Sequence, residues 1–110
     1  YYPYVHAQAL YADGRLDEAE AVLTDCLLKA PAEPNCLRMQ AVSLIGQERP
    51  IEARTVMTRL LQVEPGFTLA EERRLRRFGD SAEMQRYLSD LAAAGAPAGS
   101  GEAALARRAV

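Results

Sequence analysis

The sequence predicts an all-α fold built from antiparallel helix pairs, and two observations support this prediction. First, when residues 7–31 are aligned with residues 41–65, a shift of 34 positions, nine residues are identical, where unrelated segments would share roughly two or three. The identities are Ala7/Ala41, Leu10/Leu44, Arg15/Arg49, Glu18/Glu52, Ala19/Ala53, Val22/Val56, Thr24/Thr58, Leu27/Leu61 and Pro31/Pro65. Second, the apolar residues recur every three or four positions, which places them on one face of a helix.

The first repeat, residues 1–34, predicts two helices. One covers residues 1–12 and ends at Asp13-Gly14, because glycine readily adopts the left-handed conformation that closes a helix. The other covers residues 15–30 and stops at Pro31, which lacks the amide hydrogen needed to continue.

The second repeat, residues 35–68, predicts the same arrangement. We expect a helix over residues 35–46 with Asn35 as its N-terminal cap. A second helix begins at Pro50, a position that needs no amide hydrogen, and runs to about residue 64.

Residues 69–95 predict a degenerate third pair that caps the array, because terminal repeats often lose the register. Thr68 and Glu71 form a capping box that opens a helix to about Phe78. Asp80 opens the next helix, which ends at Gly95. Its inward residues are expected to be Met84, Tyr87, Leu88 and Leu91. Residues 96–110 are expected to be a flexible tail, with one short helix over 102–109 as the alternative.

The repeated residues resemble the tetratricopeptide repeat. Small residues recur at Ala7, Ala19, Ala41 and Ala53, large ones at Leu10, Leu23, Leu44 and Met57, and stops at Pro31 and Pro65. The resemblance implies an α-solenoid, a right-handed superhelix of antiparallel helix pairs whose first helices line a concave groove. This chain departs from the pattern at Glu48, where glycine is usual, and at the start of each first helix.

Residues 65–97 are similar to the C-terminal end of tetratricopeptide regions in bacterial multidomain regulators. The similarity lies in Pro65-Gly66-Phe67-Thr68, an arginine-rich helix, and a leucine-rich helix before Pro97. Such regulators often carry an adenylate/guanylate cyclase or a winged-helix domain upstream. The resemblance implies part of a larger regulatory or signalling protein, and no cyclase catalytic residue lies in this chain.

Composition and cysteine usage give further expectations. The 110 residues carry a net charge of −2, which does not favour nucleic acid or an anionic membrane as a partner. No apolar run approaches the ~18 residues of a membrane span. We expect Cys26 to be a buried free thiol, because it lies on an apolar helix stripe. A second cysteine ten residues on is poor metal spacing, and a cytoplasmic, reducing compartment is expected.

The sequence offers no catalytic or cofactor-binding set. His6 has no evident partner for acid–base chemistry and is expected to pack or to be partly exposed. No phosphate-binding or dinucleotide glycine motif occurs, so no cofactor is expected. One helix carries four arginines that could bind a phosphate or an acidic peptide: Arg73, Arg74, Arg76 and Arg77. A solvent-exposed helix face is the favoured interpretation, because neighbouring glutamates offset the positive charge.

The resemblance implies a partner-binding groove on the concave side. Its expected residues are Tyr1, Tyr4, Gln8 and Tyr11 on the first helix, Asn35, Arg38, Val42 and Ile45 on the third, and Glu72 and Arg76 on the fifth. Tyrosines would supply contact area, and polar groups would orient the ligand.

The function expected is therefore non-catalytic binding of a protein or peptide. Three alternatives stay open: the N-terminal tyrosines pack against a missing upstream repeat, the chain forms a homodimer through its ends, or it regulates an enzyme domain upstream.

Overall fold

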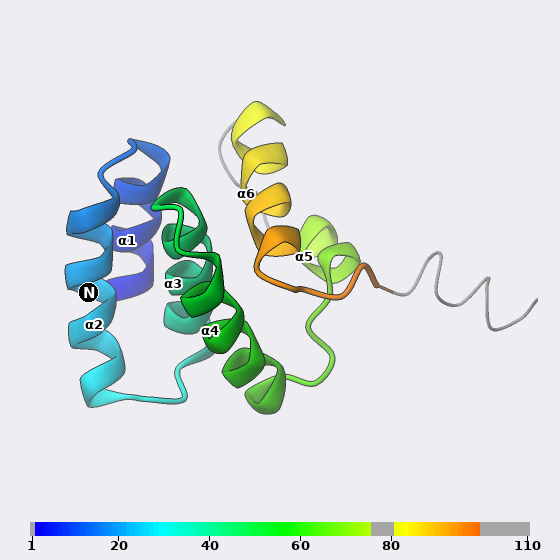
Figure 1. The fold of residues 1–110 in the computed structure, drawn as a ribbon, viewed down its shortest axis with the longest axis horizontal. Coiled ribbons are helices and arrows are strands. Elements are labelled where there is room, and N and C mark those ends of the chain that lie inside the picture. Colours follow the sequence, from blue (N-terminus) through cyan, green and yellow to red (C-terminus); the bar gives the residue numbers. More distant parts are fainter. Residues whose placement is uncertain (1, 76–80, 100–110) are drawn as a thin grey trace, which may run out of the picture.

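The computed structural model describes residues 2–75 and 81–99, which form six helices and no strand (Figure 1). The helices are α1 (Pro3–Ala12), α2 (Leu16–Lys29), α3 (Pro34–Gly46), α4 (Pro50–Val63), α5 (Leu69–Leu75) and α6 (Ser81–Ala93). The all-α prediction is confirmed for these residues. Three expectations fall on residues outside the described part of the chain. They are the helix end at Phe78, the helix start at Asp80 and the short helix over 102–109. No helix in the described part is long and apolar enough to cross a membrane.

The first two helix pairs pack as the repeat predicts. α1 packs on α2, α3 packs on α4, and the pairs meet where α2 lies against α3. The repeated small residues are fully buried between the helices, where a larger side chain would hold the backbones apart. These residues are Ala7, Ala19, Ala41 and Ala53.

The two turns inside these pairs have the same geometry. Gly14 has a φ of 77°, and Glu48, 34 positions later, has a φ of 60°. The amide of Arg15 donates to the carbonyl of Leu10 at 2.8 Å, and the amide of Arg49 donates to that of Leu44 at 2.9 Å. The second turn therefore holds a non-glycine residue in the left-handed conformation, which costs about 1 kcal/mol.

The start of α3 differs from the prediction. The cap is Glu33, whose carboxylate accepts from the amides of Asn35 at 2.5 Å and Cys36 at 3.1 Å. Pro34 holds the first helical position, so Asn35 lies inside the helix and cannot be its cap. By contrast, the predicted cap at Thr68 is confirmed, because its hydroxyl accepts from the amide of Glu71 at 3.1 Å.

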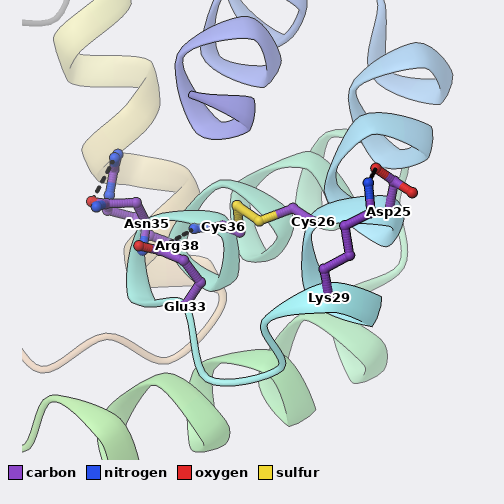
Figure 2. The surroundings of a disulfide bond; sticks show 7 residues. All are labelled: Asp25, Cys26, Lys29, Glu33, Asn35, Cys36 and Arg38. Carbon is purple, nitrogen blue, oxygen red and sulfur yellow. Dashed lines mark hydrogen bonds and ion pairs between the residues drawn. A yellow bond between two sulfur atoms is a disulfide. The ribbon is translucent and has the colours of Figure 1, made fainter. Parts of the chain in front are cut away.

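A disulfide joins Cys26 to Cys36, so the expectation of a buried free thiol at Cys26 is wrong (Figure 2). The S–S distance is 2.14 Å and the Cα atoms lie 6.7 Å apart. The bond forms because the last turns of α2 lie beside the first turn of α3, which a sequence separation of ten does not reveal. Disulfides persist mainly in oxidising compartments, so this bond gives no support to the expected cytoplasmic location.

The third pair does not repeat the packing of the second. α6 lies against α3, and the described part of α5 packs chiefly on α6 (Figure 1). α6 ends at Ala93, and Gly95 beyond it has a φ of 106°, so that the amide of Ala96 donates to the carbonyl of Leu91 at 3.0 Å and closes the helix. The chain then returns to α5, where the carbonyl of Pro97 accepts from the amide of Leu69 at 2.9 Å.

Candidate functional site at the surface of α1 and α3

The surface of α1 and α3 that was expected to form an open groove is covered by α6. Four of the predicted groove residues are almost completely buried, namely Tyr11, Arg38, Val42 and Glu72, and Tyr11 and Arg38 are hydrogen-bonded to α6. Four others are partly exposed: Tyr4, Gln8, Asn35 and Ile45. Tyr1 and Arg76 lie outside the described residues. The prediction of an open groove is therefore wrong where the residues are buried. An amphipathic helix of the same chain, α6, lies against Tyr11 and Arg38.

Arg38 is the centre of the contact between α3 and α6. It is 2 % exposed, and its Nη1 donates to the hydroxyl of Tyr87 at 2.7 Å. Its Nη2 donates to the side-chain oxygen of Asn35 at 3.3 Å, so residues predicted to act together do meet (Figure 2). The guanidinium carbon also lies 5.6 Å from the centre of the Tyr87 ring, within range of a cation–π contact. An arginine remains charged in proteins, so these contacts stabilise a buried positive charge.

The hydroxyl of Tyr87 connects Arg38 to Glu72. While accepting from Arg38, it donates to Glu72 Oε2 at 2.6 Å, which links α3, α6 and α5 through one side chain. Burial raises the pKa of Tyr87 far above its usual value; the nearby Arg38 opposes the rise and Glu72 adds to it. The hydroxyl therefore keeps its proton at neutral pH and can donate to the carboxyl group.

A second polar contact joins α6 to the end of α1. The hydroxyl of Tyr11 donates to Asp90 Oδ2 at 2.5 Å. Arg86 donates from Nη2 to the carbonyl oxygen of Tyr11 at 2.8 Å, and its guanidinium carbon lies 4.3 Å from the centre of the Tyr11 ring. The side chains on α6 thus hold both the ring and the backbone of Tyr11.

The pKa values at this second contact follow from burial. Burial, followed by the hydrogen bond to Asp90, raises the pKa of Tyr11 above its usual range. Burial also raises the pKa of Asp90, although the bond from Tyr11 and the charge of Arg86 act to lower it. Removal from water is therefore the main electrostatic effect of docking α6.

The apolar face of α6 is the one predicted from its sequence. Tyr87, Leu88 and Leu91 are buried and join the core, and Met84 packs against it while partly exposed. The sequence did not indicate Arg86 and Asp90 as contact residues, nor the polar role of Tyr87. A signal was present, because Tyr87 and Asp90 are three positions apart and so share one helix face.

Two surface hollows were also found among the described residues. One, of about 450 Å³, is lined by Gly14, Arg15, Leu16, Asp17, Glu18 and Gln47. The other, of about 300 Å³, is lined by Glu64, Gly66, Phe67, Glu71, Glu72 and Leu75. Neither lining brings together a nucleophile and a base, and no group of three metal-ligating side chains was found in the described ranges. Arg73 and Arg74, which were predicted to lie on a solvent-exposed helix face, are exposed. Arg74 forms an ion pair with Glu71, with 2.9 Å between Nη2 and Oε2.

Comparisons with protein-family models, with curated proteins and with solved structures found no match.

Proposed function

We propose that this chain is a non-catalytic interaction module that binds a protein or peptide partner on the surface formed by α1 and α3. The observation that supports the proposal is that this surface already holds a helix, α6, by apolar packing together with directed hydrogen bonds from Arg38 and Tyr11. Binding of an amphipathic helix through its apolar face is one of the common ways in which a protein groove recognises a peptide.

The residue types on this surface suit a binding role. Tyrosine and arginine are, with tryptophan, enriched among the residues that dominate binding at protein interfaces, because each offers a large contact area and a polar group. Tyr4 and Gln8 remain partly exposed on the same helix as Tyr11, so the surface extends beyond the part that α6 covers.

The proposal includes the fold family. The 34-residue repeat and the buried alanines at its repeated positions support a relationship to tetratricopeptide repeat proteins and to their superhelical stacking. The placement of α6 on α3 is a departure from regular stacking. A place within a larger bacterial regulatory protein is proposed only from the sequence resemblance of residues 65–97.

The test is a screen of helical and extended peptides against the full chain, with every ligand retested on two variants. Tyr4→Ala alters the partly exposed inner surface, whereas Leu28→Ala alters a residue on α2 that is 77 % exposed. We expect Tyr4→Ala to weaken binding about tenfold and Leu28→Ala to leave it unchanged.

Sedimentation of the chain across a range of concentrations separates partner binding from the alternative of self-association. If Leu28→Ala weakens binding and Tyr4→Ala does not, the surface of α1 and α3 is not the partner site.

A further inference from the structure

We infer that α6 is a built-in competitor for the partner site, and that the partner is an amphipathic helix that offers an aromatic hydroxyl followed, three residues later, by a carboxylate. This inference rests on the proposed function and names the partner and the regulation of the same surface.

The chemistry of the partner follows from what α6 supplies. Tyr87 delivers its hydroxyl to Arg38, and Asp90 delivers its carboxylate to the hydroxyl of Tyr11. The two side chains are three positions apart on one helix face, and Leu91 completes that face as a fully buried residue. A helix from another protein with this spacing could make the same hydrogen bonds and bury the same kind of apolar face.

The attachment of α6 differs from that of the other helices. From α1 to α4 each helix packs on the next, and the disulfide fastens α2 to α3. The described part of α5 packs chiefly on α6, so the third pair is held to the other helices mainly by the contacts of α6 with α3 and α1. We therefore expect those contacts to open while α1, α2, α3 and α4 stay packed on one another.

The docked α6 also leaves one strong donor unsatisfied. Arg38 is 2 % exposed, and its Nε makes no hydrogen bond with the described residues. A buried donor without an acceptor costs free energy. A partner helix that placed an additional oxygen near Nε would satisfy this donor, which gives it a means of competing with an intramolecular helix.

The closing experiment measures binding of a labelled synthetic peptide with the sequence of residues 81–95 to the full chain. The chain is used as wild type and as Leu91→Ala, which weakens the apolar docking of its own α6. We expect the peptide to bind the Leu91→Ala chain at least about tenfold more tightly than the wild type, because the competitor is weakened. Peptides carrying Tyr87→Phe or Asp90→Asn should each bind more weakly than the parent peptide.

Hydrogen exchange of the wild-type chain provides a readout that does not depend on a variant. If α6 opens by itself, its amides are expected to be protected at least about tenfold less than those of α3. Equal protection of α6 and α3 would show that α6 leaves only when the whole chain unfolds, and would overturn the inference.

The outcomes also separate this inference from the proposed function. Equal binding of the peptide to both chains would refute competition by α6 and leave the surface as a partner site. If the peptide bound neither chain although exchange showed α6 opening, the proposed surface itself would be wrong. Circular dichroism of the Leu91→Ala chain confirms that it is folded; should it be unfolded, the exchange result alone decides.

Discussion

Arg38 on α3 donates a hydrogen bond of 2.7 Å to the hydroxyl of Tyr87 on α6, although the two residues are 49 positions apart in the chain. Both side chains are buried, so the bond fixes the position of α6 along α3 more strictly than apolar packing would. Apolar side chains tolerate small sliding movements, whereas a buried charge that loses its partner is costly.

Removing the hydroxyl alone tests this bond. Tyr87→Phe keeps the ring but removes the hydroxyl. The guanidinium of Arg38 loses its acceptor on Tyr87, and the carboxylate of Glu72 loses its donor there. We expect the free energy of unfolding to fall by about 1–3 kcal/mol, measured by urea denaturation. Tyr2→Phe is the matched control, because Tyr2 is 68 % exposed and should change stability by less than about 0.5 kcal/mol. Equal effects of the two substitutions would contradict the importance of the buried bond.

Stability should fall at alkaline pH because of Tyr11 and Tyr87. The pKa of each is raised in the folded chain, whereas in the unfolded chain each ionises near a pH of about 10. The stabilisation is therefore fully present below about pH 10 and is lost as the pH rises toward the folded-state values, by about 1.4 kcal/mol per tyrosine at pH 11.

Urea denaturation between pH 9 and pH 11, with tyrosinate absorbance as a second signal, measures this loss. Tyr11→Phe and Tyr87→Phe should each make the decline shallower, because each removes one titrating group. A decline that both variants leave unchanged would mean that other groups cause it.

Loss of the disulfide should destabilise the chain without removing any helix. The bond between Cys26 and Cys36 closes a loop of ten residues, which corresponds to roughly 2–3 kcal/mol from the restricted unfolded chain. A reductant should lower the free energy of unfolding of the wild type by this amount and leave a Cys26→Ala/Cys36→Ala variant unaffected. Modification of both cysteines by a thiol reagent before reduction would refute the bond.

Gly14 and Glu48 both have a positive φ, so introducing glycine at position 48 and removing it at position 14 should change stability in opposite directions. Glu48→Gly should raise the free energy of unfolding by about 1 kcal/mol, because glycine adopts the left-handed conformation without strain. Gly14→Ala, at the equivalent position of the first repeat, should lower it by about the same amount. Thermal unfolding of the two variants beside the wild type measures both, and a destabilised Glu48→Gly chain would contradict the explanation.

Local features were predictable from the sequence, whereas long-range docking was not. Gly14, Pro50 and Thr68 act within one helical turn, so their effects can be derived from neighbouring residues. The resemblance to the tetratricopeptide repeat also predicted that Tyr11 on α1 and Arg38 on α3 lie on the same side of the helix pairs. Their burial was not predictable, because it depends on where α6 docks, and a face of alternating apolar and polar residues does not specify its partner.

The disulfide and the cap of α3 illustrate the same limit. Pairing of Cys26 with Cys36 requires the end of α2 to lie beside the start of α3, a tertiary relationship that the spacing of two cysteines does not encode. The helix begins at Pro34, so the cap is the preceding residue, Glu33, and not the expected Asn35. Asn35 was still placed correctly beside Arg38, since both lie on α3 one turn apart.

The disulfide also changes what a protease can do to this chain. The peptide bond between Ala32 and Glu33 follows an exposed turn between the two repeats, inside the loop that Cys26 and Cys36 close. A nick there would break the backbone but leave the two fragments covalently attached. The cleaved product would migrate as one species until a reductant was added, and its severed halves would stay side by side.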